Sequence, residues 1–184
     1  MCAQLDKDLS LEEFIDCHIR NSHGTRRLLG LAEDDYATWR QWRNSRYAEL
    51  LGTADLTYPG VPQVIETLAK RFRLCIVTSS KRSHFDLIHR RSEYLGHFEF
   101  IVALDDVSES KPSPEPYLMA IERLDLAVDG CLVVEDSSRG LQSAKAAGID
   151  CVVIAGAFSR YLDLSGAMTI LDSIEELLDE PCLT

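Results

Sequence analysis

Residues 133–148 read VVEDSSRGLQSAKAAG, and this stretch decides the fold. The apolar run Cys131 to Val134 ends in two acids, Glu135 and Asp136, and is followed by two serines and an Ala-rich segment that stops at Gly148. A short continuous apolar run is typical of a buried parallel strand. Serine is a preferred residue before the first turn of a helix, and glycine is preferred just after the last. The stretch therefore predicts a strand, an acidic turn and a helix.

The acidic pair falls at the carboxyl end of this strand. In open α/β sheets, that edge is where ligands bind. Two adjacent carboxylates repel each other, so a divalent cation is the natural group to neutralise them. For an isolated Glu-Asp pair, a solvated turn is the favoured interpretation, and the other motifs of the chain decide against it.

Size and composition limit the class of protein. The chain has 184 residues, which suits one domain, or one domain with a small appendage. A formal net charge of −11 argues against nucleic-acid and anionic membrane partners, although a basic pocket for a small anion remains compatible with it. The six cysteines form no CxxC pair, and the five histidines lack the spacing of a zinc site. Without a membrane-length apolar run or a signal segment, the pattern favours a soluble, reduced, cytoplasmic protein.

The order of the predicted elements indicates an α/β fold. Residues 10–51 read as helices and begin with a capping box formed by Ser10 and Glu13. Beyond the Pro-Gly pair at residues 59–60, strands and helices alternate strictly. Such alternation predicts a parallel sheet with helices on both faces. The strands are predicted at residues 74–77, 100–104, 131–134, 151–154 and 168–171.

Several helices have recognisable start signals. Ser83 is predicted to cap the helix after the first strand, and Ser113 is predicted to cap a helix that begins at Pro114. Ser173, with Glu176 three residues later, predicts a final helix.

Three chemically distinct groups are expected at the same edge of the sheet. Thr78 ends a strand, Lys111 precedes a helix, and the acidic pair ends another strand. Hydroxyl and backbone N–H groups at a strand-to-helix turn suit phosphate oxygens, a lysine adds a point charge, and carboxylates suit Mg²⁺. Taken singly, these residues are explained as a helix cap, a surface charge and a solvated turn. Their joint order and spacing favours a phosphate and Mg²⁺ site.

The same residues carry a family resemblance. The segments TSS at 78–80, KPSPEP at 111–116 and the stretch at 133–148 resemble the second, third and fourth motifs of haloacid-dehalogenase-like phosphatases. The branch is that of phosphoglycolate phosphatase and β-phosphoglucomutase. The resemblance implies a Rossmann-like parallel sheet with flanking helices, with residues 58–184 as the core and residues 1–57 as part of a helical cap.

The resemblance also implies roles for individual residues. Thr78 and Ser79 would bind phosphate, and Lys111 would stabilise both the phosphate and the nucleophile, so Thr78 and Lys111 are the catalytic candidates. Asp136, with Glu135, would hold Mg²⁺ directly or through water. Four cap residues are candidates for substrate contact, with ordinary helix-surface charge as the alternative: His23, Arg26, Arg40 and Arg43.

One motif of that family is missing. Its nucleophile and its general acid/base are the two aspartates of a DxDxT motif at the end of the first strand. The segment from Asp6 to Ser10 imitates this motif, but Met1 to Leu5 make a poor strand and Ser10 already begins a helix. By resemblance the strand order is 5-4-1-2-3, which puts the missing strand in the centre, between residues 131–134 and 74–77.

An empty central position would be costly. It leaves on the order of ten backbone hydrogen bonds unmade, each worth roughly 0.5–1.5 kcal/mol. That loss compares with a whole-domain stability of about 5–15 kcal/mol. It also exposes two apolar strand edges. We therefore expect that the chain lacks its natural N-terminal segment.

The predicted function is Mg²⁺-dependent hydrolysis of a small phosphorylated metabolite through an aspartyl-phosphate intermediate. A sugar phosphomutase of the β-phosphoglucomutase type shares every motif and is the first alternative. A non-catalytic binding protein that has lost its nucleophile is the second. A dehalogenase is disfavoured because that branch builds no acidic Mg²⁺ site. A response-regulator receiver is disfavoured because its acids precede its threonine and lysine in the chain.

Overall fold

The computed structural model describes residues 8–16, 30–53 and 56–183. Its contacts divide the chain into two compact units, each of which is considered by itself. The first comprises residues 1–54 with 160–162, and the second comprises residues 55–159 with 163–184. The phosphate and metal candidates all belong to the second unit.

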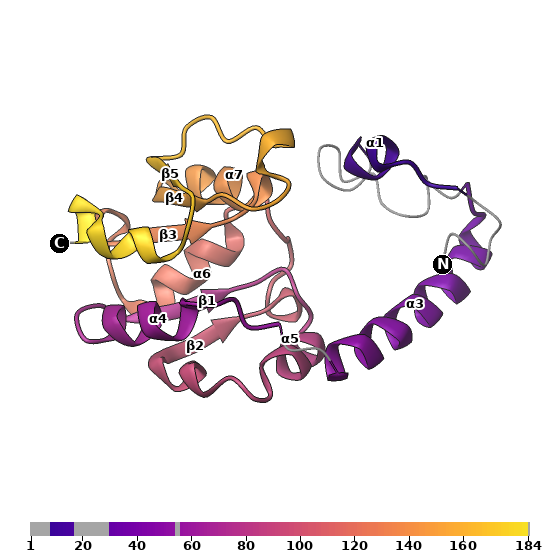
Figure 1. The fold of residues 1–184 in the computed structure, drawn as a ribbon, viewed down its shortest axis with the longest axis horizontal. Helices are drawn as coiled ribbons and strands as arrows, with labels where there is room; N and C mark the ends of the chain where they lie inside the picture. The colour runs from indigo at the N-terminus through magenta and orange to yellow at the C-terminus, as the bar shows by residue number, and fades with distance from the viewer. Residues whose placement is uncertain (1–7, 17–29, 54–55, 184) are drawn as a thin grey trace. The chain divides into compact units, whose positions relative to one another are not determined.

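The described part of residues 8–53 is helical. It contains α1 (Leu11–Phe14) and α3 (Glu33–Thr53) (Figure 1). The predicted capping box is confirmed, because Ser10 Oγ accepts a hydrogen bond from the Glu13 amide at 3.2 Å and the Ser10 amide donates to Glu13 Oε2 at 2.9 Å. This local motif fixes where the first helix begins.

The second unit has parallel strands, as predicted. They form two sheets in the order β5-β4-β3 and β1-β2, which lie one beyond the other in Figure 1. All three strand pairings are parallel, with Val133 opposite Cys151 and Val77 opposite Val102 as examples of the register. The strands are β1 (Leu74–Val77), β2 (Phe98–Val102), β3 (Leu132–Glu135), β4 (Asp150–Ile154) and β5 (Thr169–Leu171).

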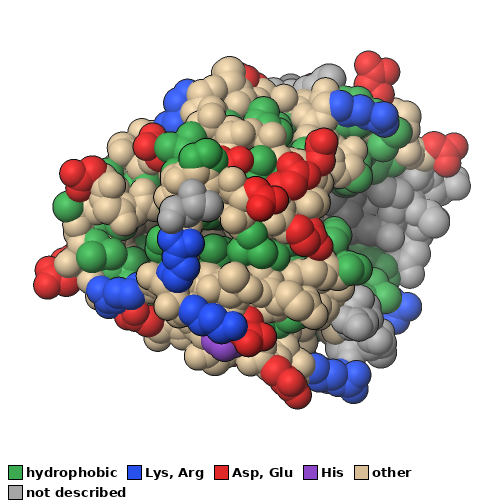
Figure 2. All heavy atoms as spheres, turned by 60° about the vertical axis from the view of Figure 1, so that its left-hand side comes forward, with side chains coloured by type: hydrophobic (Ala, Val, Ile, Leu, Met, Phe, Trp, Pro, Cys, Tyr) green, Lys and Arg blue, Asp and Glu red, His purple; other side chains and the backbone are tan. Residues whose placement is uncertain are grey.

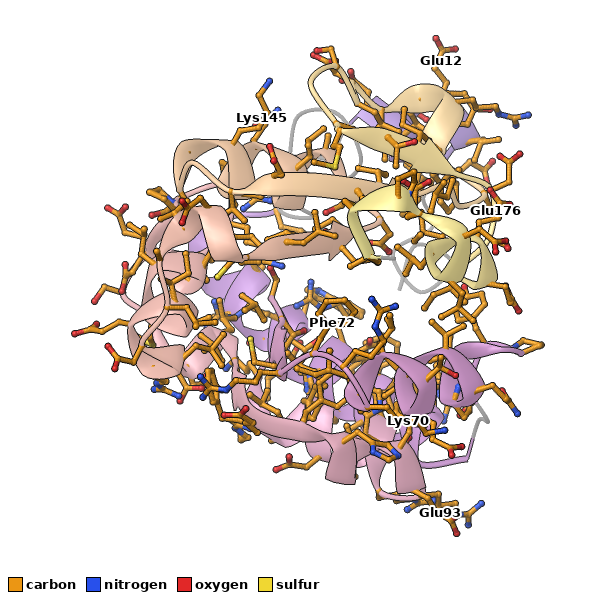
Figure 3. The ribbon with its side chains drawn as sticks, turned by 90° about the vertical axis from the view of Figure 1, so that its left-hand side faces the viewer. Glu12, Lys70, Phe72, Glu93, Lys145 and Glu176 are labelled. Atoms are coloured by element: carbon orange, nitrogen blue, oxygen red, sulfur yellow. The ribbon has the colours of Figure 1, made fainter. Side chains whose placement is uncertain are left out.

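Within the described ranges, no strand pairs with the inner edges of β1 and β3. Val77 of β1 nevertheless packs against the hydrophobic cluster that contains Val133 of β3, so the two sheets face each other across this interval. Figure 3 shows the two halves, with Lys145 and Glu176 in the half that carries β3 to β5 and Lys70 and Glu93 in the other. We call this interval the β1–β3 gap. It lies at the position that the predicted strand order gives to a central strand.

Helices cover the strands on both faces. The α-helices of this unit are α4 (Val61–Ala69), α5 (Arg82–His89), α6 (Glu115–Leu124) and α7 (Ser138–Ala146). Short 3-10 helices complete the connections: η3 (Glu93–His97), η4 (Leu104–Asp106), η5 (Val128–Gly130), η6 (Ser159–Tyr161), η7 (Glu175–Asp179) and η8 (Pro181–Leu183). The face drawn in Figure 2 has acidic and basic side chains interspersed around a band of hydrophobic ones.

Side chains of β4 alternate between two hydrophobic clusters, one on each face of the sheet. Cys151 and Val153 belong to a cluster with Tyr117 of α6 and Leu141 of α7. Val152, between them in sequence, belongs to a second cluster with three buried residues from α4, β5 and η7: Val64, Leu171 and Leu177. Successive strand residues point to opposite faces, so β4 has core on both sides, as a central parallel strand should.

Three predicted helix starts are wrong. The helix expected to begin at Pro114 after a Ser113 cap begins at Glu115, with Pro114 itself at the N-cap position. The helix expected to begin after Ser83 begins at Arg82, because its first backbone N–H donates to Asp105 Oδ2 at 2.8 Å and the local serine is not needed as a cap. The segment from Ser173 to Glu176 does not open an α-helix; it leads into the short 3-10 helix η7. A cap supplied from another loop is invisible to a local pattern.

Candidate active site

Lys111 connects the carboxyl ends of the two sheets. It lies in the loop between η4 and α6 and is only 6% exposed. Its Nζ donates a hydrogen bond to the Val77 carbonyl oxygen at the end of β1, at 2.9 Å, and another to Glu135 Oε1 at the end of β3. A buried ammonium group is stable only when it is paired. Its two partners fix the lysine at the edge where ligands bind in such folds.

Glu135 receives hydrogen bonds from three elements. Oε1 accepts from Lys111 and, at 2.6 Å, from the Tyr117 hydroxyl of α6, while Oε2 accepts from Ser137 Oγ at 3.0 Å. Burial raises the pKa of Glu135, but the Lys111 charge and these hydrogen bonds outweigh burial and leave the pKa below its usual value. The carboxylate is therefore ionised and held in one orientation.

A glycine allows this carboxylate to lie against the first turn of α7. A Cβ atom on Gly140 would stand 1.9 Å from Glu135 Cδ, which is far inside van der Waals contact. The Gly140 amide donates to Ser137 Oγ at 3.1 Å, so the predicted serine cap is present as well. The ED-S-x-x-G pattern of the sequence thus has a structural reason: Ser137 caps the first turn of α7, and Gly140 leaves room for the Glu135 carboxylate beside that turn.

Asp136 differs from its neighbour. It is exposed, and its only described contact with Glu135 is through its own backbone N–H, which donates to Glu135 Oε2 at 3.3 Å. Crowding of its carboxyl by protein atoms and the negative charge of Glu135 raise the pKa of Asp136. A group whose anionic form is disfavoured by a neighbouring anion gains from a cation. The donor set therefore fits Mg²⁺, which binds one or two carboxylates and fills the rest of its octahedron with water and substrate oxygens.

Thr78 and Ser79 form the turn that follows β1. The Thr78 amide continues the pairing with β2 by donating to the Val102 carbonyl at 2.9 Å, and Thr78 Oγ1 accepts from the Ser80 amide at 3.1 Å. Thr78 is half-buried and Ser79 is exposed. Because Lys111 binds the carbonyl of the residue before Thr78, the turn, the lysine and the acidic pair come to one edge.

The predicted substrate contacts belong to the first unit, not to the unit that carries this edge, and they stay a prediction. His23 and Arg26 lie outside the described residues. Arg40 and Arg43 belong to α3 in the first unit. Asp8, from the segment that imitates the DxDxT motif, also belongs to this unit and lies just before α1.

Three residues that support the site were missed by sequence reasoning. Arg139 of α7 donates to the Lys111 carbonyl, and Ser143 Oγ, which is fully buried, donates to the Ser113 carbonyl at 2.6 Å. The third is Tyr117 of α6, whose hydroxyl donates to Glu135 Oε1 at 2.6 Å. A buried tyrosine or mid-helix serine needs a hydrogen-bond partner, and that requirement was the available signal.

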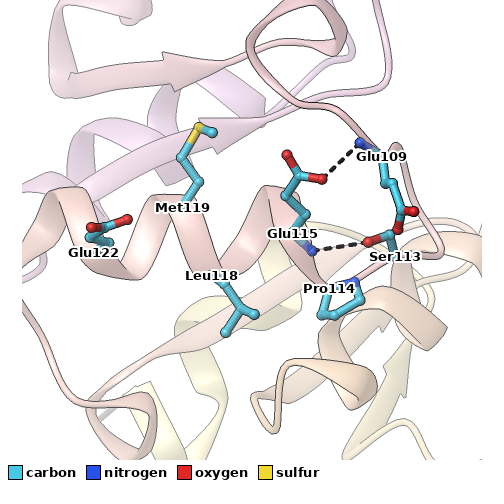
Figure 4. A pocket seen from close by; sticks show the side chains of 7 residues that line it. All are labelled: Glu109, Ser113, Pro114, Glu115, Leu118, Met119 and Glu122. Atoms are coloured by element: carbon cyan, nitrogen blue, oxygen red, sulfur yellow. Dashed lines mark hydrogen bonds between the residues drawn. The ribbon is translucent and has the colours of Figure 1, made fainter.

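A cavity of about 340 Å³ lies beside α6 (Figure 4). Glu115 lies at its centre, with Oε2 accepting from the Glu109 amide at 2.7 Å and its own amide donating to Ser113 Oγ at 3.3 Å. The lining residues are Glu109, Ser113, Pro114, Glu115, Leu118, Met119 and Glu122. Three carboxylates line it and no cation does, so it does not suit phosphate.

Among the described side chains, no group of three or more His, Cys, Asp or Glu residues is arranged around a common metal position. A metal at this edge would therefore depend on the Glu135–Asp136 pair, with water and substrate completing its shell. In the same described ranges, no helix has the length and apolar character needed to cross a membrane.

Comparison with known proteins identifies the family of the chain. Residues 7–154 match the family of haloacid dehalogenase-like hydrolases. The chain belongs to this family. It is 34% identical over 143 residues to protein CbbY of Cereibacter sphaeroides, covering 73% of this chain and 61% of CbbY. It is 29% identical over 150 residues to phosphoglycolate phosphatase of Escherichia coli K12, covering 80% and 60%.

Solved haloacid dehalogenase-like structures share the fold. The crystal structure of CbbY from Rhodobacter sphaeroides in complex with phosphate aligns with a TM-score of 0.68 at 32% identity, over 77% of this chain and 65% of that one. A CbbY mutant with xylulose-(1,5)bisphosphate aligns equally well. A family IA hydrolase from Entamoeba histolytica aligns with a TM-score of 0.76 at 23% identity, over 92% and 80%. The chain spans about three fifths of the length of the first two curated relatives.

Proposed function

We propose that this chain binds the phosphate group of a small phosphorylated metabolite, with sugar phosphates as the leading class, and serves its Mg²⁺-dependent hydrolysis. The observation that carries the proposal is the buried Lys111 ammonium group, held between the ends of β1 and β3 beside Glu135 and Asp136. A fixed cation at the ligand-binding edge, next to two carboxylates, suits a phosphate dianion together with a divalent metal.

The charges of the site support this choice. Taken by themselves, Glu135, Asp136 and Lys111 carry one net negative charge when both carboxylates are ionised, and this charge repels phosphate. A Mg²⁺ ion held by Asp136, with Glu135 directly or through water, would turn the balance to one positive charge. When bound, such a metal polarises a phosphoryl oxygen. Metal and phosphate are therefore expected to bind together.

Different protein groups would then contact different oxygens of the phosphate. Lys111 would neutralise one phosphate oxygen, and the Thr78 hydroxyl with the backbone N–H groups of the turn would orient the others, with Ser79 beside them. Residues 1–57 would form part of a helical cap over the 58–184 core, and closing such a cap excludes water from the reaction.

The nucleophile is the remaining part of the proposal. Within the described part of the second unit, no strand lies between β1 and β3, and an aspartyl-phosphate route requires an aspartate at that position. The proposal therefore includes an additional strand that carries this carboxylate. Relatives support the substrate class, because CbbY structures hold phosphate and xylulose-(1,5)bisphosphate, and a Thermotoga maritima relative, 37% identical over 93 residues, is named a phosphorylated carbohydrates phosphatase.

Release of inorganic phosphate from a panel of sugar phosphates, with and without MgCl₂, tests the proposal. The chain is assayed beside a version extended at its N-terminus by the in-frame upstream residues. We expect Mg²⁺-dependent turnover in the extended protein. Lys111→Ala and Asp136→Asn in that protein should each lower the rate by at least about a hundredfold. Near-normal rates in both variants would refute the site, and no turnover in either length of chain would favour a binding role.

A further inference from the structure

Tyr117 contacts both members of the ion pair at the site. It lies in the first turn of α6, is 6% exposed, and packs in the cluster that contains Val133 and Leu141. Its hydroxyl donates to Glu135 Oε1 at 2.6 Å, and Lys111 Nζ lies 4.8 Å from the centre of its ring. Hydrogen bonding to an ionised group and a cation over an aromatic ring are both stabilising.

The hydroxyl is a permanent donor at this position. Its oxygen lies 2.6 Å from Glu135 Oε1, and beside a carboxylate the phenol hydroxyl is the donor of the pair. The ring is fixed by its packing, and a fixed ring holds the hydroxyl in one direction. Glu135 Oε1 therefore keeps a donor that does not depend on Lys111.

That independence matters when an anion arrives. Lys111 must share its ammonium protons with the ligand, which weakens its hydrogen bond to Glu135. A buried carboxylate that loses its donor pays a large desolvation cost. The Tyr117 hydroxyl and Ser137 Oγ, which donates to the other carboxylate oxygen, keep Glu135 satisfied during that exchange.

The geometry points to Tyr117 as a positioning residue of the phosphate site: its hydroxyl holds Glu135 in place and its ring supports Lys111, so that the lysine can turn to an incoming phosphate. This inference rests on the proposed function. It assigns a role to a residue that touches neither phosphate nor metal, and it applies to the chain as it stands, with or without an additional strand.

The test is Tyr117→Phe in the full chain, which keeps the ring and removes only the hydroxyl. The probe is inorganic phosphate in the presence of MgCl₂, and its dissociation constant is measured by calorimetry at a temperature where both proteins are folded. Tyr58→Phe, at a tyrosine that is 79% exposed, is the matched control, and Lys111→Ala reports on the site itself. We expect Tyr117→Phe to weaken binding about tenfold, or about 1.4 kcal/mol, and Tyr58→Phe to leave it unchanged.

A second readout needs no ligand. The ¹⁵N NMR signal of the Lys111 ammonium group is expected to be sharp in the wild-type chain and broadened in Tyr117→Phe, because Glu135, its hydrogen-bond partner, is no longer held by the hydroxyl. A purely structural loss of stability would leave the signal sharp. Unchanged binding and an unchanged signal in Tyr117→Phe, with binding lost in Lys111→Ala, would overturn the inference and leave the proposed function standing. Unchanged binding in Lys111→Ala, or no binding by the wild-type chain, would overturn the proposed function.

Discussion

Glu135 shows how one side chain can organise a site at the scale of a residue. It is the last residue of β3, yet its carboxylate is held by the loop before α6, by α6 and by the start of α7. Its burial requires these donors, since an unpaired carboxylate in the interior is costly. Its position also requires space, and Gly140 supplies it. The glycine is thus needed for close approach and not for its backbone freedom.

Gly140→Ala tests this requirement. In an ordinary helix the change stabilises by about 0.5–1 kcal/mol. Here the new methyl group would overlap the Glu135 carboxylate, so the carboxylate must move away from Lys111 and Ser137. We expect a loss of about 1–3 kcal/mol in the free energy of unfolding, measured by urea denaturation. Gly130→Ala is the control, because nothing lies within 4 Å of a Cβ there. Equal stabilities of the two variants would contradict the steric argument.

At the scale of elements, acidic side chains connect β2 to α5. Asp106 Oδ2 accepts from the Ala103 amide at 2.8 Å, just after β2, and from Arg82 Nη2 at 2.9 Å, in the first turn of α5. The backbone hydrogen bond from Ala103, with the help of Arg82, lowers the pKa of Asp106 below its usual 3.8. The ionised form is therefore bound more strongly in the folded state than in the unfolded state.

This shift predicts a direction for the pH dependence of stability. Because the folded pKa is the lower one, the contribution of Asp106 is fully present above pH 3.8 and is lost as the pH falls through the folded pKa. The group is partly exposed, so we expect about 1 kcal/mol or less. Denaturation of Asp106→Asn and wild type at pH 6 and at pH 2.5 measures it. The variant should be less stable than wild type at pH 6, and this difference in the free energy of unfolding should be smaller at pH 2.5; a constant difference would show that the charge is irrelevant.

At the scale of the whole molecule, local signals predicted more than tertiary ones. The Ser10–Glu13 capping box and the strand–turn–helix around Glu135 were predicted because the determining residues lie within a few positions of each other. The grouping of Thr78, Lys111 and the acidic pair followed from the rule that parallel strands end at one edge. The start of α5 and the contact from Tyr117 to Glu135 were not predictable, because the partners come from 23 and 18 residues away.

The division into two sheets has a consequence for how the molecule opens. In the described part of the chain, no backbone hydrogen bonds join β1 to β3, so side chains of Lys111, Tyr117 and their neighbours carry the coupling between the halves. Side-chain contacts transmit cooperativity less completely than a continuous ladder does. Val152 and Val153 of β4 are fully buried, whereas every residue of β1 is only half-buried.

We therefore expect amide hydrogens of β4 to exchange with deuterium at least about tenfold more slowly than those of β1 under native conditions, followed by NMR. Equal protection of the two strands would instead mean a single cooperative unit. A molecule with two separate sheets can unfold one of them and keep the other. In such a partly unfolded state, the sheet of β3 to β5 with Glu135 would remain, while the Val77 carbonyl of β1 would be released from Lys111. The first event of denaturation would therefore also be the loss of the anion-binding edge.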